Sequence, residues 1–315
     1  MKHKIVFLDE GTIPGVDITP ISKLGIYTGF NNTPHDKITE NCLDAEIVIT
    51  NKTPLKTETI AQLPNLKLIC VAATGMNNID LEAARNAGIE VKNVENYSSH
   101  AVAEFTVLSV LTLYRQIIFY DSYVKSGKYA QSKYFSNAEK QTHELHGKKW
   151  GIIGLGNIGK TVANLASAFG CEVTYYSTTE EHNDPNYKRV ELETLLSDSD
   201  IISIHAPLNL KTYRMLDYHQ LSLMKPTAII VNVARGSLIN EDGLARALND
   251  GLIAGAAIDV YSSEPITADN PLNFVEDKYR LITTPHIAWS TKESLQRLIN
   301  SIAENIKAYT QKRSE

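Results

Sequence analysis

Three glycines near the middle of the chain have the spacing of a nucleotide-binding turn. Gly154, Gly156 and Gly159 stand in G-x-G-x-x-G order in WGIIGLGNIGK, directly behind an apolar run. Taken alone, this pattern fits a tight strand-to-helix turn about as well as a nucleotide site. Here it opens a helix-like segment that ends at Gly170, before a second strand-like run, CEVTYYS. That βαβ context favours dinucleotide binding.

Each glycine has a physical reason at its position. The first allows the tight turn, the second lets a pyrophosphate approach the backbone, and the third lets helix and strand pack closely. The free N–H groups and the positive dipole end at the start of the helix then attract the phosphates. We therefore predict a dinucleotide site at Gly154, Gly156 and Gly159.

Three charged or titratable residues follow later strand-like runs. Arg235, Glu264 and His286 lie in NVARGSLINEDGL, AAIDVYSSEPI and ITTPHIAWST. Ligands of an open parallel sheet bind beyond the carboxyl ends of its strands. An arginine there can clamp a carboxylate with two parallel hydrogen bonds, and a histidine beside a carboxylate can act as a general acid.

Each of the three also has a simpler interpretation, which we favour when the residue is taken singly. Arg235 could be a surface residue at a helix start capped by Ser237 or Asn240. Glu264 could be a solvated loop acid, and His286 a turn residue with satisfied hydrogen bonds. Only their occurrence together points to a catalytic site.

The elements that must position these residues alternate between strand and helix. KIVFLD, AEIVIT, LKLICVAAT and GIEVKNV are strand-like, and the alternation restarts at KWGIIGLG. Such βα repetition predicts parallel sheets covered on both faces. We expect two Rossmann-like, doubly wound α/β domains with a cleft between them: residues 1–99 plus 287–315, flavodoxin-like and substrate-binding, and residues 100–286, dinucleotide-binding. One long helix beginning at His100 would open the second domain.

Composition excludes several other classes of protein. The 315 residues carry a net charge of -5, which gives no basic excess for binding nucleic acid or an anionic membrane by charge. Cys42, Cys70 and Cys171 form no C-x-x-C motif, so neither a disulfide framework nor a zinc site is expected. The N-terminal apolar run is too short for a signal peptide. FTVLSVLTLY stops at Arg115, short of a membrane span, so we expect a cytoplasmic protein.

Taken in order, the motifs resemble those of one family. GLGNIGK, HAPLNLKT, NVARGSLINEDGL, GAAIDVYSSEP and TPHIAWST are similar to the successive motifs of the D-isomer-specific 2-hydroxyacid dehydrogenases. The resemblance extends through VAATGMNNIDLEAARNAGIEVKNVENYSSHAVAEFT and so covers nearly the whole chain. Within the family, YSSHAVAEFT and PHIAW most resemble glycerate dehydrogenase/hydroxypyruvate reductase members.

The resemblance implies roles for individual residues. Arg235 would bind the carboxylate and carbonyl oxygen of a small 2-oxo acid. His286 would give a proton to that oxygen during reduction, and Glu264 would hold the other ring nitrogen and favour the imidazolium. Backbone N–H groups of Thr74 and Gly75 would hold the carboxylate.

The resemblance also implies cofactor contacts beyond the glycines. Asn157 and Ile158 match the pyrophosphate contact, and His205 and Pro207 lie at a strand end beside the cofactor. The remaining contacts, some of them near the nicotinamide, would come from Thr106, Val233, Asp259 and His286. Trp289 is our candidate for a wall that favours short substrates, although a domain- or subunit-contact role is about equally plausible.

The choice of cofactor is open at this stage. The acid that usually binds the adenosine ribose is replaced by Ser177 in CEVTYYSTTEEH. A 2′-phosphate would normally recruit an arginine or lysine, but Glu180 and Glu181 come next and Lys188 is the nearest downstream base. We predict that NAD(H) is favoured modestly and that NADP(H) is accepted.

The predicted activity is reduction of a hydroxypyruvate- or glyoxylate-like 2-oxo acid to the D-2-hydroxy acid, without a metal. Two alternatives keep the same fold: a non-catalytic NAD(H)-sensing regulatory protein, and a dehydrogenase of another small anion such as phosphite or formate. We also expect a homodimer built on the region 100–145, because its helix and its Tyr- and Phe-containing segment carry more apolar surface than one domain needs.

Overall fold

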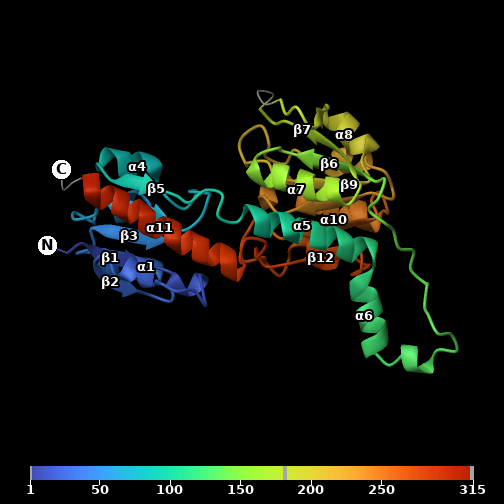
Figure 1. The fold of residues 1–315 in the computed structure, drawn as a ribbon, viewed down its shortest axis with the longest axis horizontal. Coiled ribbons are helices and arrows are strands. Elements are labelled where there is room, and N and C mark those ends of the chain that lie inside the picture. The colour runs from blue at the N-terminus through green and yellow to red at the C-terminus, as the bar shows by residue number, and fades with distance from the viewer. Residues whose placement is uncertain (1, 180–182, 313–315) are drawn as a thin grey trace. The chain divides into compact units, whose positions relative to one another are not determined.

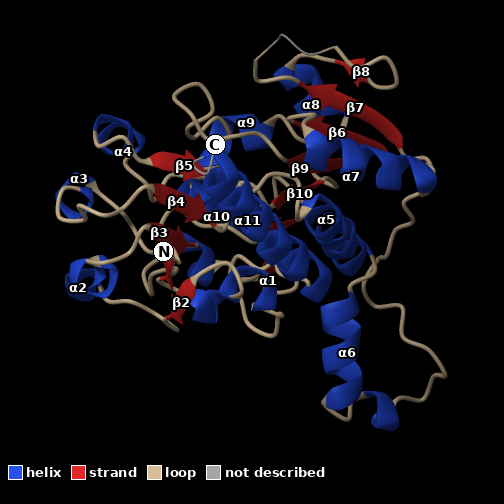
Figure 2. Cartoon of the chain, turned by 60° about the vertical axis from the view of Figure 1, so that its left-hand side comes forward, coloured by secondary structure: helices blue, strands red, loops and turns tan. Residues whose placement is uncertain are grey.

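The computed structural model describes residues 2–179 and 183–312. It divides into two compact units, residues 1–98 with 290–315 and residues 99–289 (Figure 1). Each unit has a parallel sheet and helices of its own (Figure 2). This architecture confirms the predicted fold class of two doubly wound α/β domains.

The first unit contains five parallel strands in the order β2-β1-β3-β4-β5, the flavodoxin-like order. The strands are β1 Lys4–Phe7, β2 Ile26–Gly29, β3 Ile47–Thr50, β4 Leu68–Val71 and β5 Glu90–Lys92. The helices are α1 Thr19–Ser22, α2 Ile38–Cys42, α3 Thr57–Ile60, α4 Leu81–Asn86 and α11 Lys292–Lys312. Strands β3 and β4 are buried along their whole length, which explains why their sequences read as continuous apolar runs.

The second unit contains seven parallel strands in the order β12-β11-β10-β9-β6-β7-β8. The strands are β6 Lys149–Ile153, β7 Glu172–Tyr176, β8 Lys188–Arg189, β9 Ile201–Ile204, β10 Ile229–Asn232, β11 Gly255–Ile258 and β12 Leu281–Thr283. The order is that of a Rossmann sheet with one strand added, and the chain changes direction across the sheet between β6 and β9. Ligands bind at such a switch point.

Helices cover both faces of this second sheet. The covering helices are α5 Ser99–Tyr114, α7 Asn157–Ala168, α8 Leu192–Asp198, α9 Tyr218–Ser222 and α10 Glu241–Asn249, and the unit also contains α6 Ile117–Lys125. One apolar cluster joins α5 and α7 to the sheet around Trp150. A second cluster joins α8, α9 and α10 to the opposite face. The edge that carries the glycine turn is therefore supported from both sides.

The predicted long helix is interrupted. Gln116 has φ of 52° and separates α5 from α6, and the two helices meet at a bend of 61°. The Gln116 side chain donates a hydrogen bond to the Leu113 carbonyl at the end of α5, at 2.9 Å. Helix α6 and the chain after it project from the rest of their unit (Figure 1).

The length and apolar content of a helix decide whether it could span a membrane. Among the described residues, no helix taken alone has the length and apolar content to cross a bilayer. The bent pair α5 and α6 meets those two criteria only when its members are taken together.

Candidate active site

The glycine turn after β6 has the geometry that a pyrophosphate requires. Gly154 has φ of +93°, and a Cβ there would lie 2.7 Å from the Ala206 nitrogen. A Cβ on Gly159 would lie 2.2 Å from the Gly154 oxygen. Helix α7 can therefore pack closely against the turn only because residue 159 is a glycine. At Gly156, the N-cap of α7, a Cβ would meet nothing within 4 Å. The open approach to this backbone and the adjacent helix N-terminus fit a bound dinucleotide.

Several of the predicted cofactor residues lie on the α5–α7 side of the same sheet. Asn157 and Ile158 begin α7, and Ile158 and Val233 pack against the apolar cluster under α5 and α7. Thr106 of α5 is fully buried, and its hydroxyl donates to the Val102 carbonyl at 2.8 Å. Pro207 lies on the loop after β9, where its carbonyl accepts a hydrogen bond from Thr212 at 2.7 Å.

The position expected to bind the adenosine ribose is Ser177, directly after β7. Its side chain is buried. Of the nearby bases, Lys160 pairs with Asp184 at 3.0 Å, and Lys188 and Arg189 of β8 lie opposite Thr174 and Tyr175. Glu180 and Glu181, which entered the cofactor prediction, lie outside the described residues.

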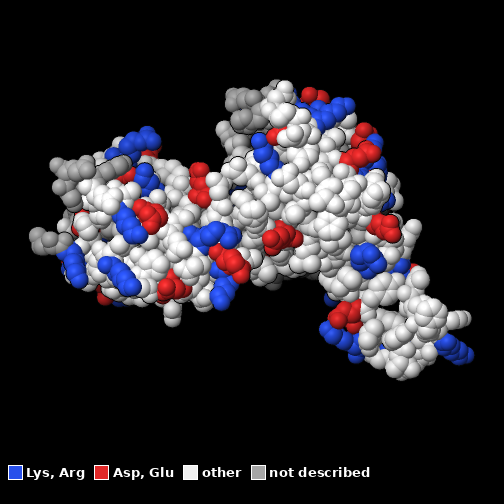
Figure 3. Space-filling model, in the orientation of Figure 1, with Lys and Arg blue, Asp and Glu red and all other residues white. Residues whose placement is uncertain are grey.

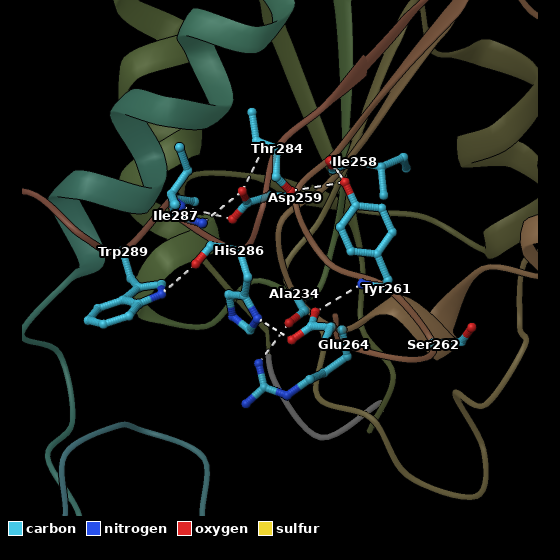
Figure 4. A network of polar contacts seen from close by, with 12 residues as sticks. Ala234, Ile258, Asp259, Tyr261, Ser262, Glu264, Thr284, His286, Ile287 and Trp289 are labelled. Atoms are coloured by element: carbon cyan, nitrogen blue, oxygen red, sulfur yellow. Dashed lines mark hydrogen bonds and ion pairs between the residues drawn. The ribbon is translucent and has the colours of Figure 1, made fainter. Parts of the chain in front are cut away.

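The predicted proton-transfer pair is assembled in this unit. His286 Nδ1 lies 2.7 Å from Glu264 Oε2, and the second carboxylate oxygen of Glu264 accepts a hydrogen bond from the Tyr261 amide at 2.9 Å (Figure 4). The carboxylate therefore fixes the Nδ1–H tautomer and leaves Nε2 for a substrate. His286 has φ of 54°, and the Trp289 indole donates to its carbonyl at 2.8 Å.

Asp259 organises the loop that carries His286. Its buried carboxylate accepts hydrogen bonds from the Thr284 hydroxyl at 2.6 Å and from the amides of Ile287 and Ala288 at 2.9 and 2.8 Å (Figure 4). Burial raises the pKa of Asp259, although these hydrogen bonds oppose the rise. The family resemblance implies a cofactor contact for Asp259, and no sequence pattern predicts its role in holding this loop.

Arg235 follows β10, the strand next to β11. Buried Asn232 holds its loop: the side-chain amide donates to the Arg235 carbonyl at 2.9 Å and accepts from the Ala234 amide at 3.1 Å. A Cβ on Gly236 would lie 1.9 Å from the Tyr261 carbonyl carbon, so this loop packs directly against the one that carries Glu264. The guanidinium of half-buried Arg235 donates through Nη1 to the adjacent Ala234 carbonyl at 2.7 Å and has no other hydrogen bond within the described part of the chain.

Ends of three adjacent strands thus supply the predicted catalytic residues. Arg235 follows β10, Glu264 follows β11 and His286 follows β12, and these strands are neighbours in the sheet. Asn232 and Tyr261, which position them, were missed in the sequence. A polar residue ending the apolar run TAIIVN was the available signal for Asn232.

The predicted carboxylate loop lies in the first unit, after β4. The Asn93 side chain donates to the Thr74 carbonyl at 2.7 Å, and the Thr74 hydroxyl donates to the Val94 carbonyl at 3.1 Å. Within the described chain, the Thr74 and Gly75 amides donate no hydrogen bond. This loop is held at its carbonyl side and presents N–H groups that an anion can bind.

Comparison with known proteins identifies the family. Residues 107–288 match the family model described as D-isomer specific 2-hydroxyacid dehydrogenase, NAD binding domain. The chain is 37% identical over 310 residues to the glycerate dehydrogenase of Methylorubrum extorquens, covering 98% of this chain and 96% of that one. The chain belongs to the D-isomer specific 2-hydroxyacid dehydrogenase family.

Other known proteins align with this chain over nearly its full length. The hydroxypyruvate reductase of Blautia hydrogenotrophica is 36% identical over 313 residues, 97% of this chain and 96% of that one. The D-lactate dehydrogenase of Aquifex aeolicus, solved with NAD and lactic acid, superposes with a TM-score of 0.82 at 26% identity over 98% and 95% of the two chains. An acyclic imino acid reductase solved with NADPH and D-Arg gives 0.87 at 29% identity, over 98% and 97%.

Proposed function

We propose that this dehydrogenase reduces a small 2-oxo acid of the hydroxypyruvate or glyoxylate type to the D-2-hydroxy acid. The single observation that carries the proposal is the His286–Glu264 pair, 2.7 Å apart, at the end of a sheet that also presents Arg235 and the glycine turn. Relatives named glycerate dehydrogenase, hydroxypyruvate reductase and glyoxylate reductase support the substrate class.

The residues of the chain bind and protonate the substrate. The glycine turn and the start of α7 would hold NAD(P)H, which would supply the hydride when bound. The Arg235 guanidinium binds the carboxylate and the carbonyl oxygen. In the first unit, the Thr74 and Gly75 amides are proposed to bind a carboxylate. His286 donates its Nε2 proton to the carbonyl oxygen as negative charge develops there, and in the reverse direction it removes that proton.

Trp289 is proposed to limit the size of the substrate. Its indole N–H donates to the His286 carbonyl, so the ring has a defined position three residues after His286. A bulky 2-oxo acid would meet this ring, whereas hydroxypyruvate and glyoxylate are small enough to avoid it. Trp289→Ala should therefore raise relative activity on bulkier substrates, and an equal loss on all substrates would contradict this role.

For the cofactor, we propose that NADH is preferred modestly over NADPH. Ser177 offers neither the ribose hydrogen bonds of an acid nor its repulsion of a 2′-phosphate. Lys160 is paired with Asp184, and the bases of β8, Lys188 and Arg189, lie opposite Thr174 and Tyr175 rather than opposite Ser177. The preference should be on the order of tenfold or less, about 1.4 kcal/mol.

We further propose a homodimer through the region 100–145. Large apolar side chains are exposed on α5, α6 and the projecting chain after them: Leu108, Ile117, Ile118, Val124, Tyr134 and Phe135. Phe135 is 93% exposed and Tyr134 78%. On the face drawn in Figure 3, the projecting segment carries charged side chains toward its edges and an uncharged surface between them. A two-fold partner would bury these side chains.

The proposal is tested by initial rates with hydroxypyruvate, glyoxylate, pyruvate and a bulky 2-oxo acid, each with NADH and NADPH. We expect the highest kcat/KM for hydroxypyruvate or glyoxylate with NADH. Binding of NADH without turnover of any 2-oxo acid would favour a cofactor-sensing protein. Oxidation of phosphite or formate instead would assign the chain to another reaction.

A further inference from the structure

A buried chain of hydrogen bonds reaches the cofactor edge of the second sheet. The Trp150 indole N–H donates to Ser203 Oγ at 2.9 Å, and His205 Nε2 lies 3.0 Å from the same oxygen. Trp150 and Ser203 are fully buried. The other ring nitrogen, His205 Nδ1, is also buried and has no hydrogen-bond partner among the described residues.

His205 stands directly beside the glycine turn. Its amide continues the sheet by donating to the Ile153 carbonyl at 2.8 Å, and a Cβ on Gly154 would lie 3.0 Å from its carbonyl carbon. Ser203 and His205 are two residues apart on an extended strand, so their side chains share one face of the sheet. Trp150 places that face on the side of α5 and α7, where the helix with the dinucleotide-binding N-terminus begins.

The hydrogen bonds of Trp150 and Ser203 indicate which nitrogen of the His205 ring carries the proton. The indole can only donate, so it occupies a lone pair of Ser203 Oγ. The Ser203 hydroxyl has one proton, and within the described chain His205 Nε2 is its acceptor. The arrangement that satisfies this hydroxyl has Nε2 as the acceptor, and a neutral ring then carries its own proton on Nδ1. Burial lowers the pKa of His205 to about 3, which keeps the ring neutral at neutral pH.

A buried N–H group without an acceptor is unfavourable. His205 Nδ1 lies beside the glycine turn, so the nearest ligand expected to supply an acceptor is the dinucleotide. We propose that His205 Nδ1–H donates a hydrogen bond to an oxygen of the bound dinucleotide, with Trp150 and Ser203 as positioning residues that fix the tautomer. The proposal rests on the proposed function, since it requires a dinucleotide at the glycine turn. It adds the donor atom and the two buried residues that orient it.

The tautomer can be measured on the unaltered protein. Nitrogen-15 spectra of the histidine rings, with the His205 signals assigned by their loss in His205→Asn, should show a protonated Nδ1 and an unprotonated Nε2. After NADH is added, the Nδ1 proton should exchange more slowly with water. A proton on Nε2 in the free protein would overturn the proposal.

Cofactor affinity provides an independent measurement. His205→Phe keeps a flat ring and removes the donor, so the Kd for NADH, measured by fluorescence titration, should rise roughly threefold to tenfold, the usual range for one hydrogen bond. His205→Asn, whose side-chain amide can donate, should bind NADH more tightly than His205→Phe. Ser203→Ala should weaken NADH binding because the His205 proton is no longer held on Nδ1. Exposed His219 on α9 supplies the control, His219→Phe, which should bind like the parent.

The two possible failures are distinguishable. If the parent binds NADH and His205→Phe binds it equally well, the assignment of His205 is wrong while the proposed function stands. If the parent binds neither NADH nor NADPH, the proposed function fails, and the proposal for His205 fails with it. If His205→Phe does not fold, the spectra of the unaltered protein still decide the tautomer.

Discussion

The most specific chemistry of this chain belongs to one imidazole ring. Because Glu264 bonds Nδ1 of His286, only Nε2 can exchange a proton with a substrate. His286→Gln should leave NADH binding intact and lower kcat by roughly two to four orders of magnitude, the usual contribution of a positioned acid–base group. His219→Gln, on the exposed side of α9, is the control. Turnover within a fewfold of the parent would remove His286 from the mechanism.

The neighbouring carboxylate should set the pH range of the reaction. Glu264→Gln removes the negative charge that contacts His286 Nδ1, and the loss of a neighbouring anion disfavours a cationic group. The pH profile of the reductive kcat/KM should therefore shift to lower pH, with a smaller loss of rate than for His286→Gln. A profile that does not move would show that the two side chains are not coupled.

Substitution of Arg235 tests whether the substrate requires the planar guanidinium or only a positive charge. Arg235→Lys keeps the charge and loses the paired hydrogen bonds, so KM for hydroxypyruvate should rise and kcat should fall. Arg246→Lys on α10, where the side chain is 67% exposed, should change neither constant. If the lysine enzyme matches the parent, Arg235 has a structural role only.

His205 should also make the fold sensitive to acid. Its pKa is lowered to about 3 by burial, whereas an unfolded histidine titrates near 6.5. Below about pH 6.5 the unfolded state gains a proton that the folded state does not, so unfolding becomes easier as the pH falls toward 3, by up to about 1.4 kcal/mol per pH unit. Urea unfolding at pH 7 and pH 5 should show a smaller pH effect for His205→Phe than for the parent. An equal effect in both proteins would contradict this account.

At the scale of helices and strands, the sequence predicted those features that neighbouring residues determine. Glycine spacing predicted the turn between β6 and α7, and the apolar runs before Arg235, Glu264 and His286 predicted that each of these residues follows a strand. The break at Gln116 was missed because a non-glycine residue takes the left-handed conformation there. The role of Asp259 was missed because its partners lie 25 to 29 residues away, and no local pattern records such a pairing.

The end of β7 should control the choice of cofactor. Ser177→Asp restores an acid that bonds the ribose hydroxyls and repels a 2′-phosphate, so it should increase the preference for NADH. The ratio of kcat/KM for NADH to that for NADPH measures the effect. A parent that strongly prefers NADPH would mean that a cation from another segment reaches this position.

For the whole molecule, the sequence predicted two α/β domains and the family but not the buried contacts that orient their loops.

The proposed dimer is the main expectation at this scale. Light scattering at micromolar concentration should give twice the mass of one 35.0 kDa chain. Tyr134→Ser combined with Phe135→Ser should weaken association at least tenfold, because both side chains lose their apolar contact area. Phe274→Ser, which alters a residue 66% exposed elsewhere in the same unit, is the matched control. A monomeric parent would refute the dimer.

The central claim is that this chain reduces a 2-oxo acid to the D-hydroxy acid with a proton from His286. Chiral analysis of the glycerate formed from hydroxypyruvate and NADH, by the parent and by His286→Gln in parallel, tests it most directly. The account predicts D-glycerate from the parent and only traces of product from the variant. L-glycerate, no product from the parent, or equal yields from both proteins would contradict it.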